Sequence, residues 1–343
     1  MASLFANHSS TTNSTFYDGE ANLTWEERVF FAVLFSLMAA VSVIGNSLAF
    51  LTLRKIKMQA SALLINLTIG DIGLGGFVMT TSAITLIKER WVFGEVACSI
   101  IAFIKAVSIF SSNMTLCMIA LDRFIFVKSI RFSRKTRERL DWFFLLFPWV
   151  WSGLSAVGPL VGWGKFSWAP TRVVCTIDWL HSPSYTLACF TCYGFIPNIF
   201  ILACYLQILR YVCVNKKRLQ KSRQCYRGPR SNESSTRSSS VSSSDRTAIR
   251  AIKFSTTVSR EEIGVLKTAV VVVLVFFTMA IPYVIIQLIS LVQNHEFPLR
   301  IGTISTVFVF FGSCLNPFIY SGGNVKFRIG LKKVIMGFIC KDG

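Results

Sequence analysis

Long apolar stretches dominate the chain, and short polar connections separate them. Seven stretches reach roughly 20 residues or more, the length that a helix needs to cross the hydrocarbon core of a bilayer. They cover residues 29–53, 58–87, 96–127, 142–163, 184–209, 268–292 and 301–320. The interior of a bilayer offers the backbone no hydrogen-bond partners, and helices of this length satisfy their own. The pattern therefore predicts an all-α membrane protein, a seven-transmembrane helix bundle.

A soluble helical protein is the alternative, and the distribution of charge argues against it. The first, fourth, sixth and seventh stretches contain no Asp, Glu, Lys or Arg. A helix that is apolar on every side has no face to present to water. The composition agrees, because 52% of the 343 residues are hydrophobic and only 15% are charged.

The basic residues indicate how the bundle is oriented. Most of the 36 Lys and Arg lie in the connections after the first, third and fifth stretches and in the segment after the seventh. Loops rich in Lys and Arg are retained in the cytoplasm, so we expect the N-terminus outside. Glycosylation triplets begin at Asn7, Asn13 and Asn22 in that outer segment. The sequence thus predicts a multi-pass protein of the plasma membrane with an extracellular N-terminus.

Three regions follow from this topology. Residues 1–28 form the extracellular, glycosylated N-terminus, residues 29–321 the helix bundle, and residues 322–343 an interfacial helix with a short cytoplasmic tail. Inside the bundle region, residues 214–259 are polar and rich in Ser. Such a segment has too little apolar surface to fold alone, so we expect a disordered cytoplasmic loop.

The segment after the seventh stretch has an amphipathic pattern. Its apolar residues recur at helical spacing opposite Lys326, Arg328 and Lys333. These apolar residues are Phe327, Leu331, Val334, Ile335 and Phe338. A helix with this pattern lies along the lipid surface. We therefore expect an amphipathic interfacial eighth helix, with Cys340 after it as a palmitoylation site.

The net charge and the cysteines add two expectations. The formal net charge of +19 is spread over several cytoplasmic connections, which favours anionic membrane lipids as partners and argues against nucleic acid. The ten cysteines show no metal-ligand spacing. Cys98 and Cys175 both fall in outside segments, where the compartment is oxidising, and we predict a disulfide between them.

One motif in each stretch, in a fixed order, connects the chain with a known family. The motifs are Gly45-Asn46, residues 66–71, residues 121–124, Trp149, Pro197 with Tyr205, Phe276 with Pro282, and residues 316–320. Together they resemble the rhodopsin-like (class A) G-protein-coupled receptors over residues 29–340. The resemblance implies a receptor that converts an extracellular stimulus into activation of a heterotrimeric G protein.

An enzyme and a transporter are the other classes to weigh. The stretches contain no His/Glu metal set and no paired acids or Ser/His/Asp arrangement of the kind that catalysis needs. They also lack the inverted repeats and broken helices in corresponding halves that are typical of transporters. Neither class accounts for Asp122-Arg123 together with Glu262. We therefore expect no enzyme, and no metal site beyond a sodium site.

Asp71 is a carboxylate at bilayer depth, which is costly unless it faces the interior of the bundle. The resemblance implies that Asp71, Ser112, Ser313 and Asn316 form a hydrated sodium pocket. Gly312 occupies a place where many members of the family have a polar ligand. A hydrogen-bonding hub without an ion is the second interpretation, and the sequence leaves both open.

The resemblance also assigns a switch to the cytoplasmic side. In this family an arginine such as Arg123 pairs with its neighbouring acid, here Asp122, and with an acid on the sixth helix, here Glu262. It turns toward the G protein when the sixth helix moves outward, and a bidentate guanidinium suits that role. Tyr205 and Tyr320 belong to the same switch. Receptor kinases and arrestin are expected to act on the Ser-rich loop.

The outer residues 158–163 and 175–179 look closest to the opsins and to their neighbours such as melatonin receptors. Opsins hold retinal through a lysine six residues before the asparagine of the motif at 316–320, and that position here is Phe310. The stretch 301–320 contains no lysine. A standard photopigment is therefore disfavoured, and no cofactor is implied beyond the sodium ion left open above.

Other departures concern the region where the family binds ligands. Ala280 replaces the usual tryptophan before the sixth-helix proline, Ile101 stands at the usual counterion position, and Lys105 replaces the acid that binds biogenic amines. A lysine buried at this depth calls for a partner. The partner is an acidic small ligand, Asp178 of the outer loop, or an aldehyde such as retinal. The predicted ligand site thus contains Lys105, Asp178, Phe310, Ala280 and Ile101.

Overall fold

The structure, a computed structural model, describes residues 23–56, 61–128, 133–226 and 260–339, without the side chains of 134, 215–226, 260–265 and 339. Within these ranges 7 helices are long and apolar enough to span a membrane. They are α1 (Trp25–Lys55), α2 (Ser61–Gly73) continued by η1 (Leu74–Met79) and α3 (Thr80–Lys88), α4 (Gly94–Val127), α5 (Arg134–Ala156), α6 (Pro183–Cys189) continued by η4 (Phe190–Phe195) and α7 (Ile196–Tyr226), α9 (Arg260–Gln293) and α10 (Leu299–Gly323). The predicted seven-helix membrane fold is confirmed.

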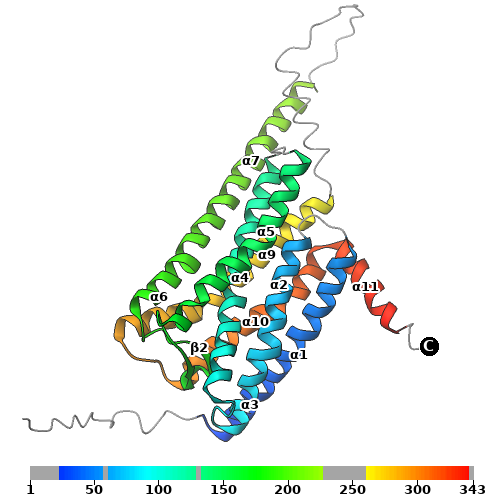
Figure 1. Cartoon of the computed structure of the whole chain (residues 1–343). Coiled ribbons are helices and arrows are strands. Elements are labelled where there is room, and N and C mark those ends of the chain that lie inside the picture. Colours follow the sequence, from blue (N-terminus) through cyan, green and yellow to red (C-terminus); the bar gives the residue numbers. More distant parts are fainter. Residues whose placement is uncertain (1–22, 57–60, 129–132, 227–259, 340–343) are drawn as a thin grey trace, which may run out of the picture.

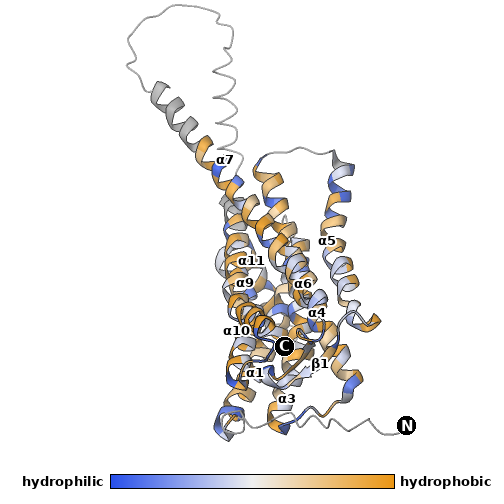
Figure 2. Ribbon diagram, turned by 90° about the vertical axis from the view of Figure 1, so that its left-hand side faces the viewer, coloured by the Kyte–Doolittle hydropathy of each residue, from blue (hydrophilic) through white to orange (hydrophobic). Residues whose placement is uncertain are grey.

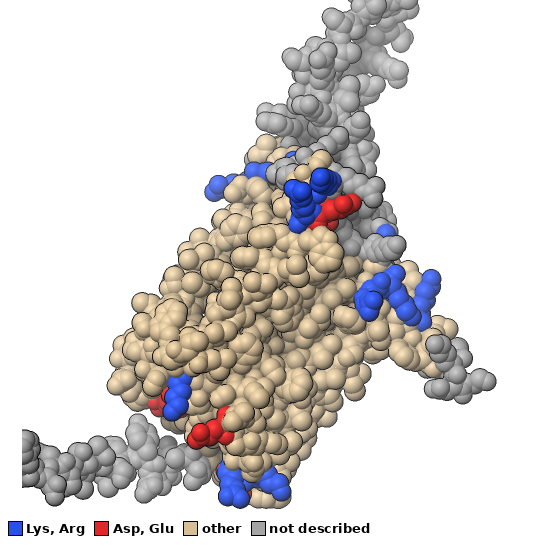
Figure 3. Space-filling model, in the orientation of Figure 1, with Lys and Arg blue, Asp and Glu red and all other residues tan. Residues whose placement is uncertain are grey.

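The helices stand side by side in one bundle, with α4 packed against α2, α5 and α7 (Figure 1). Two apolar cores fill it. One lies toward the N-terminal end of α1 and includes Phe35, Ile101 and Phe310, and the other lies toward the opposite end and includes Leu116 and Tyr320. Apolar residues run along the helices of the bundle (Figure 2), and many of the large ones are exposed on its outside. On the face in Figure 3, Lys, Arg, Asp and Glu gather at the two ends and leave an uncharged band between them, as expected for a protein that crosses a bilayer.

The boundaries of α5, α7 and α9 differ from those predicted, and α9 begins at Arg260 instead of 268. Helix α5 begins at Arg134, where the Ser133 hydroxyl accepts a hydrogen bond from the Thr136 N–H, and it ends at Ala156 before Pro159. Helix α7 continues to Tyr226, past residue 214, where the polar pattern predicts a loop. Lys, Arg, Gln and Leu in this continuation are good helix formers, and their propensity outweighs the lack of an apolar face.

The two π-helical segments, η1 and η4, were not predicted. A π-helical turn inserts an extra residue and changes which side chains face the interior on either side of it. In η1, a Cβ added at Gly75 would lie 2.9 Å from Cβ of Ser42, so the small residue allows α1 to approach. In η4, Phe190 and Phe195 line the internal cavity described below.

Helix α11 (Val325–Ile339) confirms the predicted eighth helix. It leaves the end of α10 and runs away from the bundle axis (Figure 1). The Asn324 side chain accepts a hydrogen bond from the Phe327 N–H at 3.2 Å and caps its start. Phe327 and Val334 are buried against the bundle, whereas Lys332 and Lys333 are exposed. An apolar face with a basic opposite face suits the surface of anionic lipid.

A short hairpin covers one end of the bundle. Strands β1 (Phe166–Ala169) and β2 (Val174–Ile177) pair antiparallel, with Trp168 opposite Cys175. The hairpin was not predicted, although its aromatic and β-branched residues favour strands. Cys175 forms a disulfide with Cys98 at the start of α4, so the predicted pair is confirmed and the hairpin is tied to the bundle.

A buried arginine joins the hairpin to two other segments. Arg172, in η3 (Pro170–Arg172) between the strands, donates to Glu296 Oε1 at 2.6 Å and to Gln287 Oε1 at 2.5 Å. Its side chain is only 5% exposed. Gln287 belongs to α9 and Glu296 lies between α9 and α10, so one guanidinium holds three parts of the chain together.

Replacing Gly302 of α10 by Ala is expected to destabilise the protein. A Cβ at Gly302 would overlap the carbonyl oxygen of Thr171, which is backbone and cannot move without moving the hairpin. Such overpacking costs about 1–3 kcal/mol. Gly322→Ala in the same helix is the matched control, because nothing lies within 4 Å of a Cβ there. Thermal unfolding of the two purified variants compares them, and equal midpoints would refute the tight contact.

Candidate functional site

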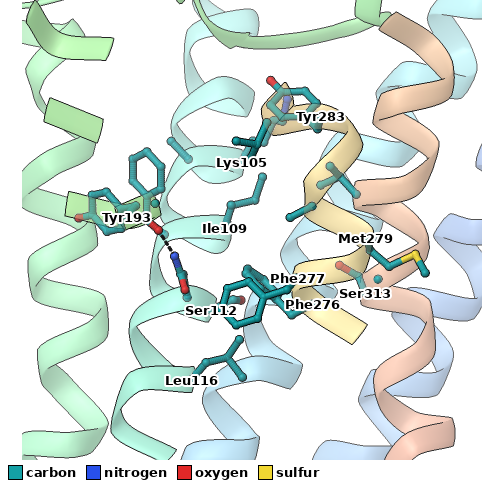
Figure 4. A pocket seen from close by; sticks show the side chains of 18 of the residues that line it. Lys105, Ile109, Ser112, Leu116, Tyr193, Phe276, Phe277, Met279, Tyr283 and Ser313 are labelled. Atoms are coloured by element: carbon teal, nitrogen blue, oxygen red, sulfur yellow. Dashed lines mark hydrogen bonds between the residues drawn. The ribbon is translucent and has the colours of Figure 1, made fainter. Parts of the chain in front are cut away.

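A cavity of about 480 Å³ lies inside the bundle, within the size range of small-molecule sites. Residues of α4, β2, η4, α7, α9 and α10 form its walls, and α2 contributes at the deep end. Figure 4 shows Lys105 and Tyr283 at one end, Ile109 below them, and Phe276, Phe277, Ser112 and Ser313 toward the other end. Aromatic and aliphatic side chains make up most of the wall.

Lys105 is a buried cation on the cavity wall. Its side chain points from α4 toward Tyr283 of α9 (Figure 4), it is 4% exposed, and its ammonium nitrogen lies 5.5 Å from the centroid of the Tyr283 ring. The ammonium donates a hydrogen bond to Thr176 Oγ1 of β2 at 3.1 Å. A cation–π contact and a neutral acceptor offset only part of the several kcal/mol that burial of a charge costs. The site can therefore stabilise an anionic group brought by a ligand.

The expected internal partner of Lys105 does not take this place. Asp178 Oδ1 accepts hydrogen bonds from the N–H groups of Leu180 and His181, each at 3.1 Å, and so caps a loop turn. No ion pair of the described residues joins Asp178 to Lys105. Of the three alternatives for the partner of Lys105, the pair with Asp178 does not agree with this geometry, because the backbone after β2 turns the carboxylate toward its own loop.

The other predicted ligand residues divide into two groups. Ala280 and Phe310 line the cavity, and the fully buried Phe310 ring also packs edge-on against Phe35. Ile101 does not line it, because it lies one helical turn nearer the disulfide, in the core beneath the hairpin. Neither Ile101 nor Asp178 is therefore part of the cavity.

The deep end of the cavity contains the predicted oxygen-rich group. Asp71 is 4% exposed and accepts a hydrogen bond from Asn316 Nδ2 at 2.6 Å. The hydroxyl of Ser112 is buried and has no hydrogen-bond partner among the described atoms. Ser313 lines the same end. Carboxylate and hydroxyl oxygens fit a hard cation, and the geometry equally fits a hydrogen-bonding hub, so both interpretations stay open.

The C-terminal half of α4 carries a buried charge cluster. Arg123 and Asp122, both 1% exposed, form a salt bridge. Asp122 also accepts from Arg137 of α5 at 2.7 Å, and Arg137 reaches Asp141 at 3.0 Å. Two guanidinium groups therefore share one buried carboxylate, and each N–H···O contact is charge-assisted. The Arg123 Nε atom has no partner among the described atoms.

Other predicted members of the switch lie near this cluster or outside the described side chains. The hydroxyls of Tyr205 and Tyr320 are buried without a described partner, and the Tyr320 ring packs edge-on against Phe327 of α11. Glu262 lies in the first turn of α9, but its side chain is outside the described set, so its pairing with Arg123 stays a prediction.

The sequence did not identify several residues of these sites. Tyr283 and Thr176 contact Lys105, and Arg172 fixes the hairpin above the cavity. Trp179 donates to the Tyr283 hydroxyl at 3.1 Å and holds that ring in place. The one signal available in the sequence was the charge of Arg172, which indicates neither its partners nor its depth.

The predicted modification sites lie outside the described residues. These are the sequons at Asn7, Asn13 and Asn22, the palmitoylation site at Cys340, and the part of the Ser-rich loop at 227–259. Glycosylation, palmitoylation and phosphorylation at these positions stay predictions.

Comparison with known proteins agrees with this architecture. The sequence model of the 7 transmembrane receptor (rhodopsin family) matches residues 45–320. Rhodopsin of Todarodes pacificus is 26% identical over 296 residues, covering 83% of this chain and 61% of that protein. The alpha-1A adrenergic receptor of Oryzias latipes is 28% identical over 325 residues, covering 90% of this chain and 67% of that protein.

The fold agrees as well. The crystal structure of squid rhodopsin superposes with a TM-score of 0.74 at 20% sequence identity, covering 94% of this chain and 92% of that one. The matched family consists of receptors and not of enzymes, which confirms the non-enzymatic prediction. With seven apolar spans, the predicted disulfide and a family match over most of its length, this chain belongs to the rhodopsin family of seven-transmembrane G-protein-coupled receptors.

Proposed function

We propose that this receptor binds a small extracellular ligand in the cavity beside Lys105 and activates a heterotrimeric G protein from the end that carries Arg123. The observation that carries the proposal is a buried ammonium on the wall of a largely apolar cavity, with no anionic partner among the described residues. A folded protein retains such a costly group where a function depends on it.

The direction of signalling follows from the charge distribution. The N-terminus faces the outside of the plasma membrane, and the Arg-rich and Lys-rich connections face the cytoplasm. Anionic lipids contact the basic face of α11, and receptor kinases followed by arrestin act on the Ser-rich loop. A ligand at Lys105 favours an arrangement of the helices that it binds more tightly, and that arrangement exposes the Arg123 region to the G protein.

Cells that express the receptor with a panel of G-protein dissociation sensors test this function. We expect a surface-delivered receptor to dissociate at least one class of G protein, and Arg123→Ala to abolish that response at equal surface expression. The matched control is Arg54→Ala, an exposed arginine near the end of α1. A wild-type response that survives Arg123→Ala unchanged would remove Arg123 from the switch.

The same assay, run in darkness and in light with and without retinal, tests the alternative of an opsin-like photoreceptor. In that alternative Lys105 would form the Schiff base, since Phe310 occupies the position of the opsin lysine. The described part of the cavity wall contains one carboxylate, Asp71, and it is hydrogen-bonded to Ser313, which lies at the opposite end from Lys105 (Figure 4). A protonated Schiff base there would have no adjacent counterion, so we expect no light dependence.

A further inference from the structure

The cavity has an unusually simple distribution of charge. Among the described residues that line it, Lys105 is the only cation and Asp71 the only anion. They lie on different helices and at opposite ends. Lys105 and Ser112, the neighbour of the Asp71 end, are seven residues apart on α4, which corresponds to roughly 10 Å along the axis. The cavity therefore offers a ligand a positive charge at one end and an apolar channel that extends from it toward Asp71.

The Lys105 ammonium has more N–H donors than the described residues offer acceptors. It carries three N–H groups. Thr176 Oγ1 accepts from one of them at 3.1 Å, and the Tyr283 hydroxyl, which also accepts from Trp179, accepts from a second. One N–H group is thus left for an oxygen of a ligand carboxylate. An amine headgroup would be repelled by the same ammonium.

The channel behind Lys105 is apolar and open. Ile109 lines its middle, and Phe276 and Phe277 lie below, toward the other end (Figure 4). The wall there also contains Ala280 and Gly312, whose small size leaves the space connected as far as Ser313 and Asn316. A Cβ added at Gly312 would meet only Met279, at 3.5 Å. Such a channel takes up a flexible hydrocarbon chain without burying polar groups.

From these features we infer that the ligand is an amphiphilic carboxylate, with its headgroup on Lys105 and its apolar tail extending past Ala280 toward the Asp71 end. The inference rests on the proposed function for its signalling role, but binding itself does not depend on coupling to a G protein. The charge of Lys105 selects an anionic headgroup, and the small side chain of Ala280 determines how long a tail fits.

The headgroup is tested with purified receptor in nanodiscs, by titration with myristate and with tetradecanol, which has the same chain and no charge. We expect myristate to bind at least tenfold more tightly. Lys105→Met should weaken myristate binding about 10- to 100-fold, the equivalent of a charge-assisted hydrogen bond, and leave tetradecanol unchanged. Lys88→Met, which removes an exposed lysine at the end of α3, is the matched control and should bind as wild type.

The tail is tested by the length of the ligand. Ala280→Trp fills the middle of the channel, so it should weaken binding of myristate about tenfold or more while octanoate binds as before. Ala203→Trp adds the same side-chain volume at an exposed position of α7 outside the cavity, and it serves as the control. Should Ala280→Trp not be recovered as folded protein, octanoate and myristate on the wild type still test the channel, since only the longer chain gains from it.

The outcomes separate this inference from the proposed function. Equal affinity of wild type for myristate and tetradecanol, or unchanged myristate binding in Lys105→Met, overturns the carboxylate class even if the receptor signals to other compounds. Loss of myristate and octanoate binding alike in a folded Ala280→Trp overturns the placement of the tail. Specific, Lys105-dependent binding without any G-protein response would support the ligand class and contradict the proposed function instead.

Discussion

Replacing Asp122 by Asn is expected to raise signalling in the absence of any agonist. Asp122 is the carboxylate shared by Arg123 and Arg137, and Asp122 and Arg123 are each 1% exposed. Asn keeps the shape and removes the charge, so the buried Arg123 guanidinium loses the one carboxylate that pairs with it among the described side chains. Removing one partner of a buried ion pair costs about 3–5 kcal/mol. The cost falls on the arrangement in which Arg123 is buried, and the protein shifts toward any arrangement that exposes it.

A shift of only 1.4 kcal/mol changes the ratio of the two arrangements about tenfold, so a several-fold rise in basal G-protein dissociation is expected. Surface expression must be matched, because the same substitution lowers the stability of the resting receptor. Asp141→Asn is the control, since Asp141 binds the same Arg137 at 3.0 Å but is 53% exposed, and such pairs contribute about 0–1 kcal/mol. Basal activity equal to wild type in Asp122→Asn would show that the pair does not restrain the receptor.

The parts of the fold that the sequence predicted are those governed by short-range physics. A run such as residues 29–53, with no charge over its whole length, has to be a helix in lipid, whatever its neighbours are. The pattern of Phe327, Leu331 and Val334 likewise determines the helix after the seventh span. The disulfide could be predicted because the topology put Cys98 and Cys175 in the same oxidising compartment.

Contacts between loops could not be predicted in the same way. Arg172 meets Gln287 and Glu296, which are more than a hundred residues away along the chain, with sequence separations of 115 and 124. Which of the outer acids such an arginine finds depends on the path of the hairpin and of the connection between α9 and α10. The same holds for Asp178, because its carboxylate binds backbone N–H groups two and three residues ahead instead of crossing to Lys105.

The sequence predicted several residues that line the cavity, but it did not predict the shape of the cavity. Lys105, Ala280 and Phe310 were assigned to it by resemblance, and they line it. Its connection to the Asp71 end depends on two small residues on facing helices, Ala280 and Gly312, and on the π-helical turn η4 that brings Phe190 and Phe195 to the wall. A π-helical turn has no sequence pattern of its own, so the shape of the channel could be determined only from the structure.

Replacing Cys98 or Cys175 by Ser is expected to abolish delivery of the receptor to the cell surface. The disulfide joins the first turn of α4 to strand β2 across a sequence separation of 77 residues. Loss of a native disulfide typically costs about 2–5 kcal/mol, a large share of the stability of a folded domain. The hairpin that it fixes also carries Thr176, a hydrogen-bond partner of Lys105, so any receptor that escapes degradation should lose ligand response.

Flow cytometry of an N-terminal tag measures surface delivery, and Cys213→Ser, at an exposed free cysteine of α7, is the matched control. The double variant with Ser at both positions separates two explanations. If the bond between the two sulfurs is what matters, the double variant is no worse than either single one, because each single change already removes it. If each cysteine acts instead by its own packing, the two losses add. Normal surface levels and normal response in both single variants would contradict the structural role of the disulfide, and the hairpin would then depend on the Arg172 contacts alone.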